Sequence, residues 1–170
     1  MDRKHAVRFV APVILLAVIG VASRDAKAQS GPFQYYAVTP CRIADTRSAG
    51  YNSGAYLNGT PSLPADPTGS LTRAFFIKGG TCGVPNTAKA VSVNATVANP
   101  TVLGWLALWP ASSSYSGIST LNFDAGAGAT ANGAVVPLSS CTAPCGDMKV
   151  RYGAATGTLD FILDVTGYFQ

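Results

Sequence analysis

Two short blocks near opposite ends of the sequence combine charged with apolar residues. Residues 40–47 read Pro-Cys-Arg-Ile-Ala-Asp-Thr-Arg, and residues 164–169 read Asp-Val-Thr-Gly-Tyr-Phe. An aspartate beside an arginine can form a hydrogen-bonded ion pair, whereas aspartates grouped together can bind a hard cation or supply acid and base for hydrolysis. Which chemistry the blocks support depends on the other titratable groups that can reach them.

Groups suited to catalysis are scarce in this sequence. The single histidine, His5, lies in the N-terminal 28 residues, and glutamate is absent, so a serine or cysteine nucleophile lacks its usual base. Asp160 and Asp164 lie on one predicted strand face about 13 Å apart, whereas glycosidase carboxylates lie roughly 5 to 9.5 Å apart. A closer pair of aspartates across two strands is the alternative. We expect no catalytic residue, no cofactor and no enzymatic activity.

If the two blocks pair, their charged residues form an ion-pair network with a structural role. Its members are Arg42, Asp45, Arg47, Asp160 and Asp164. A partly buried network of this kind fixes the register of strands more than it adds net stability. The alternative is a calcium site built from Asp45 with Asp160 or Asp164, which the neighbouring arginines disfavour because they repel a dication. We therefore predict the structural network and no metal site.

The N-terminal segment, residues 1–28, has the features of a secretory signal peptide. Basic residues precede an apolar run at residues 9–21, and Ala26-Lys27-Ala28 is a small-x-small cleavage signal. The run is shorter than the roughly 20 apolar residues that a membrane-spanning helix needs. An uncleaved anchor is the alternative. We expect cleavage before residue 29, and a domain of residues 29–170 that is secreted, extracellular or at the cell surface without stable membrane insertion.

Removal of this segment changes the charge of the protein. The whole sequence has 12 basic and 8 acidic residues and a formal net charge of +4. Five of the basic and two of the acidic residues lie in the first 28 positions, so the exported domain keeps seven basic and six acidic residues. It also contains no run of basic residues. A nucleic-acid partner is not expected, because such proteins carry a strongly basic surface.

The four cysteines predict disulfide bonds. An exported chain meets an oxidising compartment, and an even number of cysteines can pair completely. Cys141 and Cys145 flank a short turn-like segment, which favours a local bridge and leaves Cys41 to pair with Cys82; the other two connectivities stay open. The alternative is a four-cysteine zinc site, but the sequence lacks a Cys-x-x-Cys pair, and such a site would need reduced thiols outside the cell.

Strand patterns dominate the sequence. Residues 90–97 alternate strictly between apolar and polar side chains, as in a half-buried strand. Further strands are expected at residues 35–39, 71–78, 103–109, 118–123, 131–138, 148–152 and 158–168, separated by segments rich in glycine and proline. Because no window has sustained helical periodicity, we predict a single all-β domain, an antiparallel β-sandwich, with a β-barrel as the alternative.

Aromatic residues give the clearest signal for binding. On an extended strand at residues 103–109, Trp105 and Trp109 share one face and two leucines share the other. If the leucines face the core, the two rings form an exposed platform about 13 Å long that could stack on sugars or cover another protein. The alternative places both tryptophans in the core or under the long loop at residues 48–69. Tyr115 fits either arrangement, and the loop residues Tyr51 and Tyr56 are further candidates for binding.

The order of several blocks resembles a largely uncharacterised module of bacterial secreted and surface proteins. The blocks are Pro-Cys-Arg-x-x-Asp-Thr-Arg at 40–47, Cys-Gly-Val-Pro at 82–85, Leu-Trp-Pro at 108–110, Ser-Thr-Leu-Asn-Phe at 119–123 and Asp-Val-Thr-Gly-Tyr-Phe at 164–169. That module occurs alone, in tandem or attached to secreted hydrolases, which implies an accessory or surface role. The Cys141 and Cys145 pair departs from the pattern.

Together these observations favour a non-catalytic exported module with a structural or adhesive role. A carbohydrate-binding or cell-envelope-binding module is the first alternative, with an extracellular polysaccharide or an envelope component as partner. Self-association is the second alternative, because an unpaired N-terminal stretch at residues 29–38 could add a strand to a neighbouring copy.

Overall fold

The computed structural model describes residues 31–47, 63–64, 71–140 and 146–170. The chain divides into two compact units, residues 1–31 and 32–170, and all the described strands lie in the second. The predicted signal peptide, the candidates Tyr51 and Tyr56, and the cysteines Cys141 and Cys145 lie outside the described residues. Within the described ranges, no helix is long and apolar enough to cross a membrane.

The described residues of the domain form nine strands. In chain order they are β1 (Tyr35–Asp45), β2 (Leu63–Pro64), β3 (Arg73–Phe75), β4 (Ala90–Ala98), β5 (Gly104–Pro110), β6 (Leu121–Phe123), β7 (Ala129–Pro137), β8 (Met148–Gly153) and β9 (Thr158–Phe169). Each predicted strand overlaps one of these, and β2 was not predicted because it lies in a segment rich in turn residues. β1 extends further than predicted, to Asp45, because two irregularities in its pairing carry the strand past Pro40.

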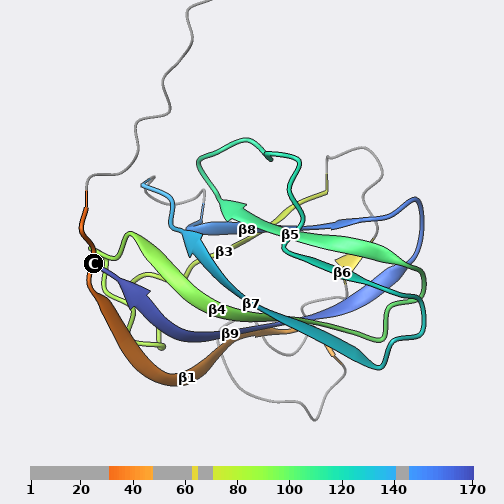
Figure 1. Cartoon of the computed structure of the whole chain (residues 1–170), viewed down its shortest axis with the longest axis horizontal. Helices are drawn as coiled ribbons and strands as arrows, with labels where there is room; N and C mark the ends of the chain where they lie inside the picture. Colours follow the sequence, from red (N-terminus) through yellow and green to blue (C-terminus); the bar gives the residue numbers. More distant parts are fainter. Residues whose placement is uncertain (1–30, 48–62, 65–70, 141–145) are drawn as a thin grey trace, which may run out of the picture. The chain divides into compact units, whose positions relative to one another are not determined.

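The strands form two antiparallel sheets. One has the order β1-β9-β4-β7, with β2 also pairing with β9, and the other has the order β3-β8-β5-β6. Figure 1 shows the two layers, with β4, β9 and β1 side by side in one and β8 and β5 in the other. Among the described strands, no hydrogen-bonded ladder joins the sheets. The predicted all-β sandwich is therefore confirmed, and the barrel alternative is wrong.

Alternation of side chains along the central strands builds the core. On β4, Val91, Val93 and Val97 are buried, whereas the polar residues between them are partly exposed. From the facing sheet, Leu106 of β5 and Phe75 of β3 enter the same core, and the Phe75 ring lies 5.7 Å from that of Phe161 on β9. Burying each large apolar side chain contributes roughly 1.5 to 3 kcal/mol, so this two-sided core is the main source of stability.

The last strand, β9, is the centre of the first sheet. It pairs with β1 on one side, with β4 on the other, and with β2 near its start. Gly167 has to be glycine because any side chain there would collide with the ring of Tyr35. Next to it, the rings of Tyr36 and Tyr168 stack with centroids 5.2 Å apart. These contacts explain why the Asp-Val-Thr-Gly-Tyr-Phe block mixes a glycine with aromatic residues.

The N-terminal part of the domain is paired within its own sheet. Tyr35, Tyr36 and Ala37 lie opposite residues 167–169 of β9, and Gln34 exchanges two backbone hydrogen bonds with Gln170. The expectation of an unpaired N-terminal strand is therefore wrong for residues 34–37. β9 pairs with one edge of these residues, so they are not the unpaired strand expected, and self-association through the N-terminal strand stays a prediction.

Candidate functional site

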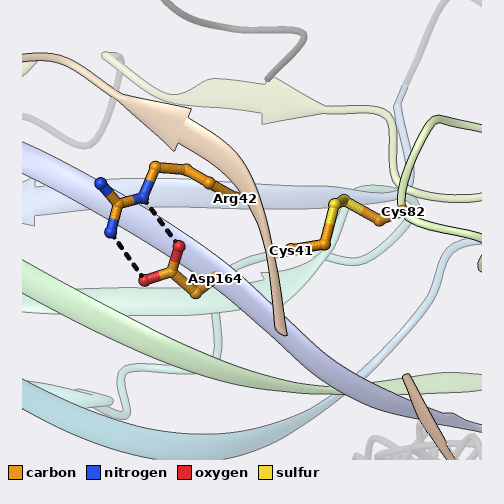
Figure 2. The surroundings of a disulfide bond; sticks show 4 residues. All are labelled: Cys41, Arg42, Cys82 and Asp164. Carbon is orange, nitrogen blue, oxygen red and sulfur yellow. Dashed lines mark hydrogen bonds and ion pairs between the residues drawn. A yellow bond between two sulfur atoms is a disulfide. The ribbon is translucent and has the colours of Figure 1, made fainter. Parts of the chain in front are cut away.

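The two charged blocks meet on the outer face of the first sheet. The register places Arg42 of β1 directly opposite Asp164 of β9. The Arg42 guanidinium donates from Nε to Asp164 Oδ1 at 2.8 Å and from Nη2 to Oδ2 at 3.3 Å, the two-pronged arrangement shown in Figure 2. The hydrogen bond to Asp164 raises the pKa of Arg42. The predicted pairing of the blocks is therefore present, and it links the first and last strands of the domain.

Asp45 is the buried centre of this cluster. Its side chain is fully buried, and its Oδ2 accepts hydrogen bonds from Arg42 at 2.8 Å and from Arg47 at 2.7 Å. Its Oδ1 accepts from Nε of Arg47 at 2.9 Å and from the Arg47 amide at 3.1 Å. Burial alone disfavours the charged carboxylate, but the hydrogen bonds and charges of Arg47 and the charge of Arg42 outweigh it and lower the pKa of Asp45.

Thr46 continues the pairing of the two strands beyond the end of β1. Its amide donates to the Phe161 carbonyl at 3.0 Å, and its hydroxyl accepts from the Phe161 amide at 2.8 Å. The same hydroxyl lies 3.4 Å from Oδ1 of Asp160. The other oxygen of Asp160, Oδ2, accepts a hydrogen bond from the side-chain amide of Asn99 at 2.9 Å. Asp160 thus joins the cluster through Thr46. Thr46 is not among the predicted network residues, although it directly follows Asp45 in the same block.

A disulfide lies directly beside the ion pair. Cys41 of β1 is bonded to Cys82 in the connection between β3 and β4, with Cα atoms 5.5 Å apart (Figure 2). This confirms the long-range bridge. In the chain-entropy model, a closed loop of this length stabilises the fold by about 4 kcal/mol. We refer to Cys41, Arg42, Asp45, Thr46 and Arg47 together with Cys82 and Asp164 as the clasp.

The geometry of the clasp fits a structural role better than a catalytic or metal-binding one. Both oxygens of Asp45 accept hydrogen bonds from arginines, and both oxygens of Asp164 accept from Arg42. Arginines compensate the charge of both carboxylates and occupy their oxygens, which makes the pair a poor site for a dication. Over the described ranges, no group of three or more potential ligand residues is placed to hold a metal ion.

The tryptophan strand lies on the opposite sheet, and its leucines do face the core. Leu106 is fully buried and Leu108 packs against the core, which puts Trp105 and Trp109 on the outer face. Trp109 is nevertheless only 7% exposed. Residues 111–117 fold back over it, and its indole Nε1 donates to the Ser113 carbonyl at 3.1 Å. The prediction of an exposed two-tryptophan platform is therefore wrong for Trp109, because the following loop covers this ring.

Trp105 is half-buried in a stack with Tyr115 and Arg151, which with Trp109 we call the aromatic cluster. The rings of Trp105 and Tyr115 are nearly parallel, at 10°, with centroids 5.4 Å apart. The Arg151 guanidinium lies 5.2 Å from the Trp105 ring and 5.3 Å from the Tyr115 ring, within cation–π range. The indole covers Gly153 so closely that no side chain would fit there. Arg151 was not predicted, because its place depends on the β5–β8 register.

A second buried charge pair lies outside every predicted site. Asp147 is 5% exposed, and its Oδ2 accepts from the amides of Ile77 and Lys78 at 2.7 and 2.8 Å. The Lys78 ammonium lies 3.1 Å from the other oxygen and donates to the Ser139 carbonyl. These bonds explain why β3 ends at Phe75 although the sequence predicts a strand to residue 78: the next amides bond a side chain instead of a strand.

The chain matches no protein-family model, no curated protein and no solved structure.

Proposed function

We propose that this chain is an exported, non-catalytic module with a structural or adhesive role outside the cell. The observation that supports this role most directly is the clasp. It joins the first strand to the last through the Arg42–Asp164 ion pair, and to the connection between β3 and β4 through the disulfide. The charged residues that would otherwise suggest a reactive site are thereby occupied with holding the fold.

The disulfide also supports the proposed location. Disulfides form and persist in oxidising compartments such as the periplasm or the exterior of the cell. An N-terminal segment with the composition of a signal peptide precedes the domain. Export would supply the oxidising conditions that the Cys41–Cys82 bridge needs, and the bridge would protect a marginally stable domain in a compartment that lacks cytosolic chaperones.

Export and processing are tested by expressing the full chain in a bacterium and analysing the product of each compartment. We expect a protein that begins at Gln29, with Cys41 and Cys82 linked in non-reducing peptide maps. A matched chain in which Ala26 and Ala28 are both replaced by leucine should remain unprocessed, because the small-x-small signal is lost. Recovery of the unaltered chain in the cytoplasm, with Cys41 reduced, would contradict the proposal.

Adhesion is tested with the processed protein labelled on an amine and incubated with envelopes of the producing cells. We expect saturable retention that heat-unfolded protein at the same concentration does not share. No retention, together with free diffusion in the culture medium, would rule out the adhesive and structural roles alike.

Carbohydrate binding is the second candidate, because Trp105 borders an open hollow. The hollow has a volume of about 440 Å³, and its lining includes Trp105, Asn122 and Asp124. An indole edge next to polar side chains is a common arrangement for holding a sugar ring. In polysaccharide pull-downs, Trp105→Ala and Asn122→Ala should lose retention, while Phe76→Ala, an exposed aromatic elsewhere, should keep it. Equal retention of all variants would remove this candidate.

A further inference from the structure

The outer strand β7 leaves one edge of the first sheet open. Its nine residues pair with β4 residue by residue, without a bulge, from Ala98↔Ala129 to Ala90↔Pro137. Away from β4, β7 lies close to β5 and β6 of the other sheet, and the side-chain amide of Asn132 donates to the Thr120 carbonyl at 2.7 Å. Over the described ranges, no backbone hydrogen bond reaches that side of β7. A regular row of donors and acceptors therefore faces outward.

This edge lacks the usual protection against pairing. Natural edge strands carry charged side chains, an interior proline or a bulge, which block the approach of another strand. The β7 sequence Ala-Thr-Ala-Asn-Gly-Ala-Val-Val-Pro contains no charged residue, and its proline is the last residue. Val135 is 59% exposed, an unusual position for a large apolar side chain on a strand of small residues. The strand β7 is thus free of bulges, uncharged and partly apolar.

We propose that β7 pairs antiparallel with β7 of a second copy of this chain, about a two-fold axis at Gly133. Gly133 is the central residue of the strand, so the axis would place Ala131 opposite Val135 of the partner and Ala129 opposite Pro137. A two-fold pair uses the same patch twice, and only an antiparallel ladder satisfies that symmetry for a strand edge. The two first sheets then become one continuous sheet.

A second copy of this chain fits the open edge because β7 carries no charged side chain. Like charges directly opposite each other destabilise a strand pair, and self-pairing would double any charge that β7 carried. Because it carries none, self-pairing meets no repulsion. Near the same edge, Ile118 is 71% exposed and lies two residues before Thr120, the contact of Asn132. This residue extends the apolar surface that two copies would cover.

The expected dimer is weak. A single nine-residue ladder buries less than the roughly 1,200 Å² of a standard stable interface, so we expect dissociation in the micromolar range or weaker, above about 1 µM. High local concentration, as at a cell surface, would populate it. The inference goes beyond the proposed function and requires only the folded domain, so either one can fail without the other.

Introducing a charged side chain of either sign at Gly133 provides the test. A side chain fits there, since the nearest atom to an added Cβ is the Val93 carbonyl oxygen at 4.0 Å. In Gly133→Lys or Gly133→Glu, the two-fold axis would set two like charges face to face and weaken association by about tenfold or more. An equal mixture of the two variants would oppose lysine to glutamate and restore it. The neutral Gly133→Ser should associate like the original protein.

The measurement is sedimentation velocity of the processed protein from about 5 µM to about 1 mM, a range that spans the expected dissociation constant, with near-ultraviolet circular dichroism to verify that each variant is folded. We expect the average mass of the original protein and of Gly133→Ser to rise toward twice the monomer. Each charged variant alone should need about tenfold higher concentrations to dimerise, and their mixture should dimerise like the original protein. A monomer at every concentration, or association that both charged variants keep, would overturn the proposal.

Discussion

The two edges of the first sheet, β1 and β7, differ in almost every respect. β1 has two pairing irregularities, a proline, a disulfide and the charged residues of the clasp. β7 is regular along its whole length and carries no charge. Because both are outer strands of one sheet (Figure 1), the core beneath them cannot explain the difference. The comparison indicates that one edge holds the domain together, whereas the other is the one that we propose for contact between copies.

Loss of the disulfide should have the largest effect on the β1 side. In Cys41→Ser combined with Cys82→Ser, we expect the free energy of unfolding to fall by about 4 kcal/mol, since the unfolded chain regains the freedom that the bridge removes. Urea unfolding monitored by tryptophan fluorescence measures it. A loss below about 1 kcal/mol would mean that the bridge is not what distinguishes this edge, because it lies far outside the range for native disulfides.

Neutralising Asp45 should have the next largest effect. Asp45→Asn keeps the shape of the side chain but removes the charge that three arginine nitrogens share. We expect a loss of about 2 to 3 kcal/mol, less than for a fully buried pair because both arginines are partly exposed. Asp124→Asn, at an exposed site, is the matched control and should change stability by less than about 0.5 kcal/mol. Equal effects of the two substitutions would contradict a special role for Asp45.

Acid should weaken the β1 edge in particular. The folded-state pKa of Asp45 is lowered from its ordinary value of 3.8, so its ionisation stabilises the folded state above that value. The contribution is lost as the pH falls from about 5 through the folded pKa, because the unfolded chain takes up the proton first. In urea titrations at decreasing pH, Asp45→Asn should show a shallower decline in stability than the original protein. Parallel declines would assign the acid sensitivity to other carboxylates.

Removing Arg42 should have a smaller effect. Its side chain is 32% exposed and that of Asp164 is 22% exposed, so solvent screens the pair. We expect Arg42→Ala to cost about 1 kcal/mol, mainly because Asp164 loses its hydrogen-bond donor. Arg42→Lys should recover only part of this, since an ammonium cannot reproduce the two-pronged contact. Unchanged thermal unfolding of Arg42→Ala would remove Arg42 from the structural network.

The same kind of change on β7 should barely affect folding. Val135→Thr keeps a branched side chain at an exposed position, so we expect a change within about 0.5 kcal/mol in the free energy of unfolding. Its effect should appear instead as weaker self-association, because apolar surface at the dimer edge is lost. A loss of stability as large as that of Asp45→Asn would show that both edges serve the fold and would end the contrast between them.

Local patterns in the sequence predicted the sandwich and much of the clasp. Strict alternation located β4, and the two charged blocks predicted an arginine–aspartate network between them, in which the structure pairs Arg42 with Asp164. Both signals are local, since each depends on side chains within one strand or one short block. The open β7 edge was not predicted, because an edge is defined only by which strands are absent beside it.

Other features could not be predicted because they depend on contacts between distant segments. Trp109 is buried by a loop whose path follows no sequence rule, and Asp147 binds Lys78, which lies 69 positions earlier in the sequence. No periodicity relates such pairs. The contacts of Asp147 with Ile77 and Lys78 end β3 at Phe75. The predicted strand end at residue 78 was wrong because these contacts were not predicted.

The central place of β9 also determines when the domain can form. Because β9 is the last strand in the chain and pairs with both β1 and β4, the first sheet lacks its middle until residues 158–169 are present. The Arg42–Asp164 pair spans 122 residues, and folds dominated by such distant contacts form slowly, in milliseconds to seconds. A chain emerging from the ribosome therefore lacks the middle of this sheet until residues 158–169 have been synthesised. Under the proposed export, folding and disulfide formation would follow on the far side of the membrane.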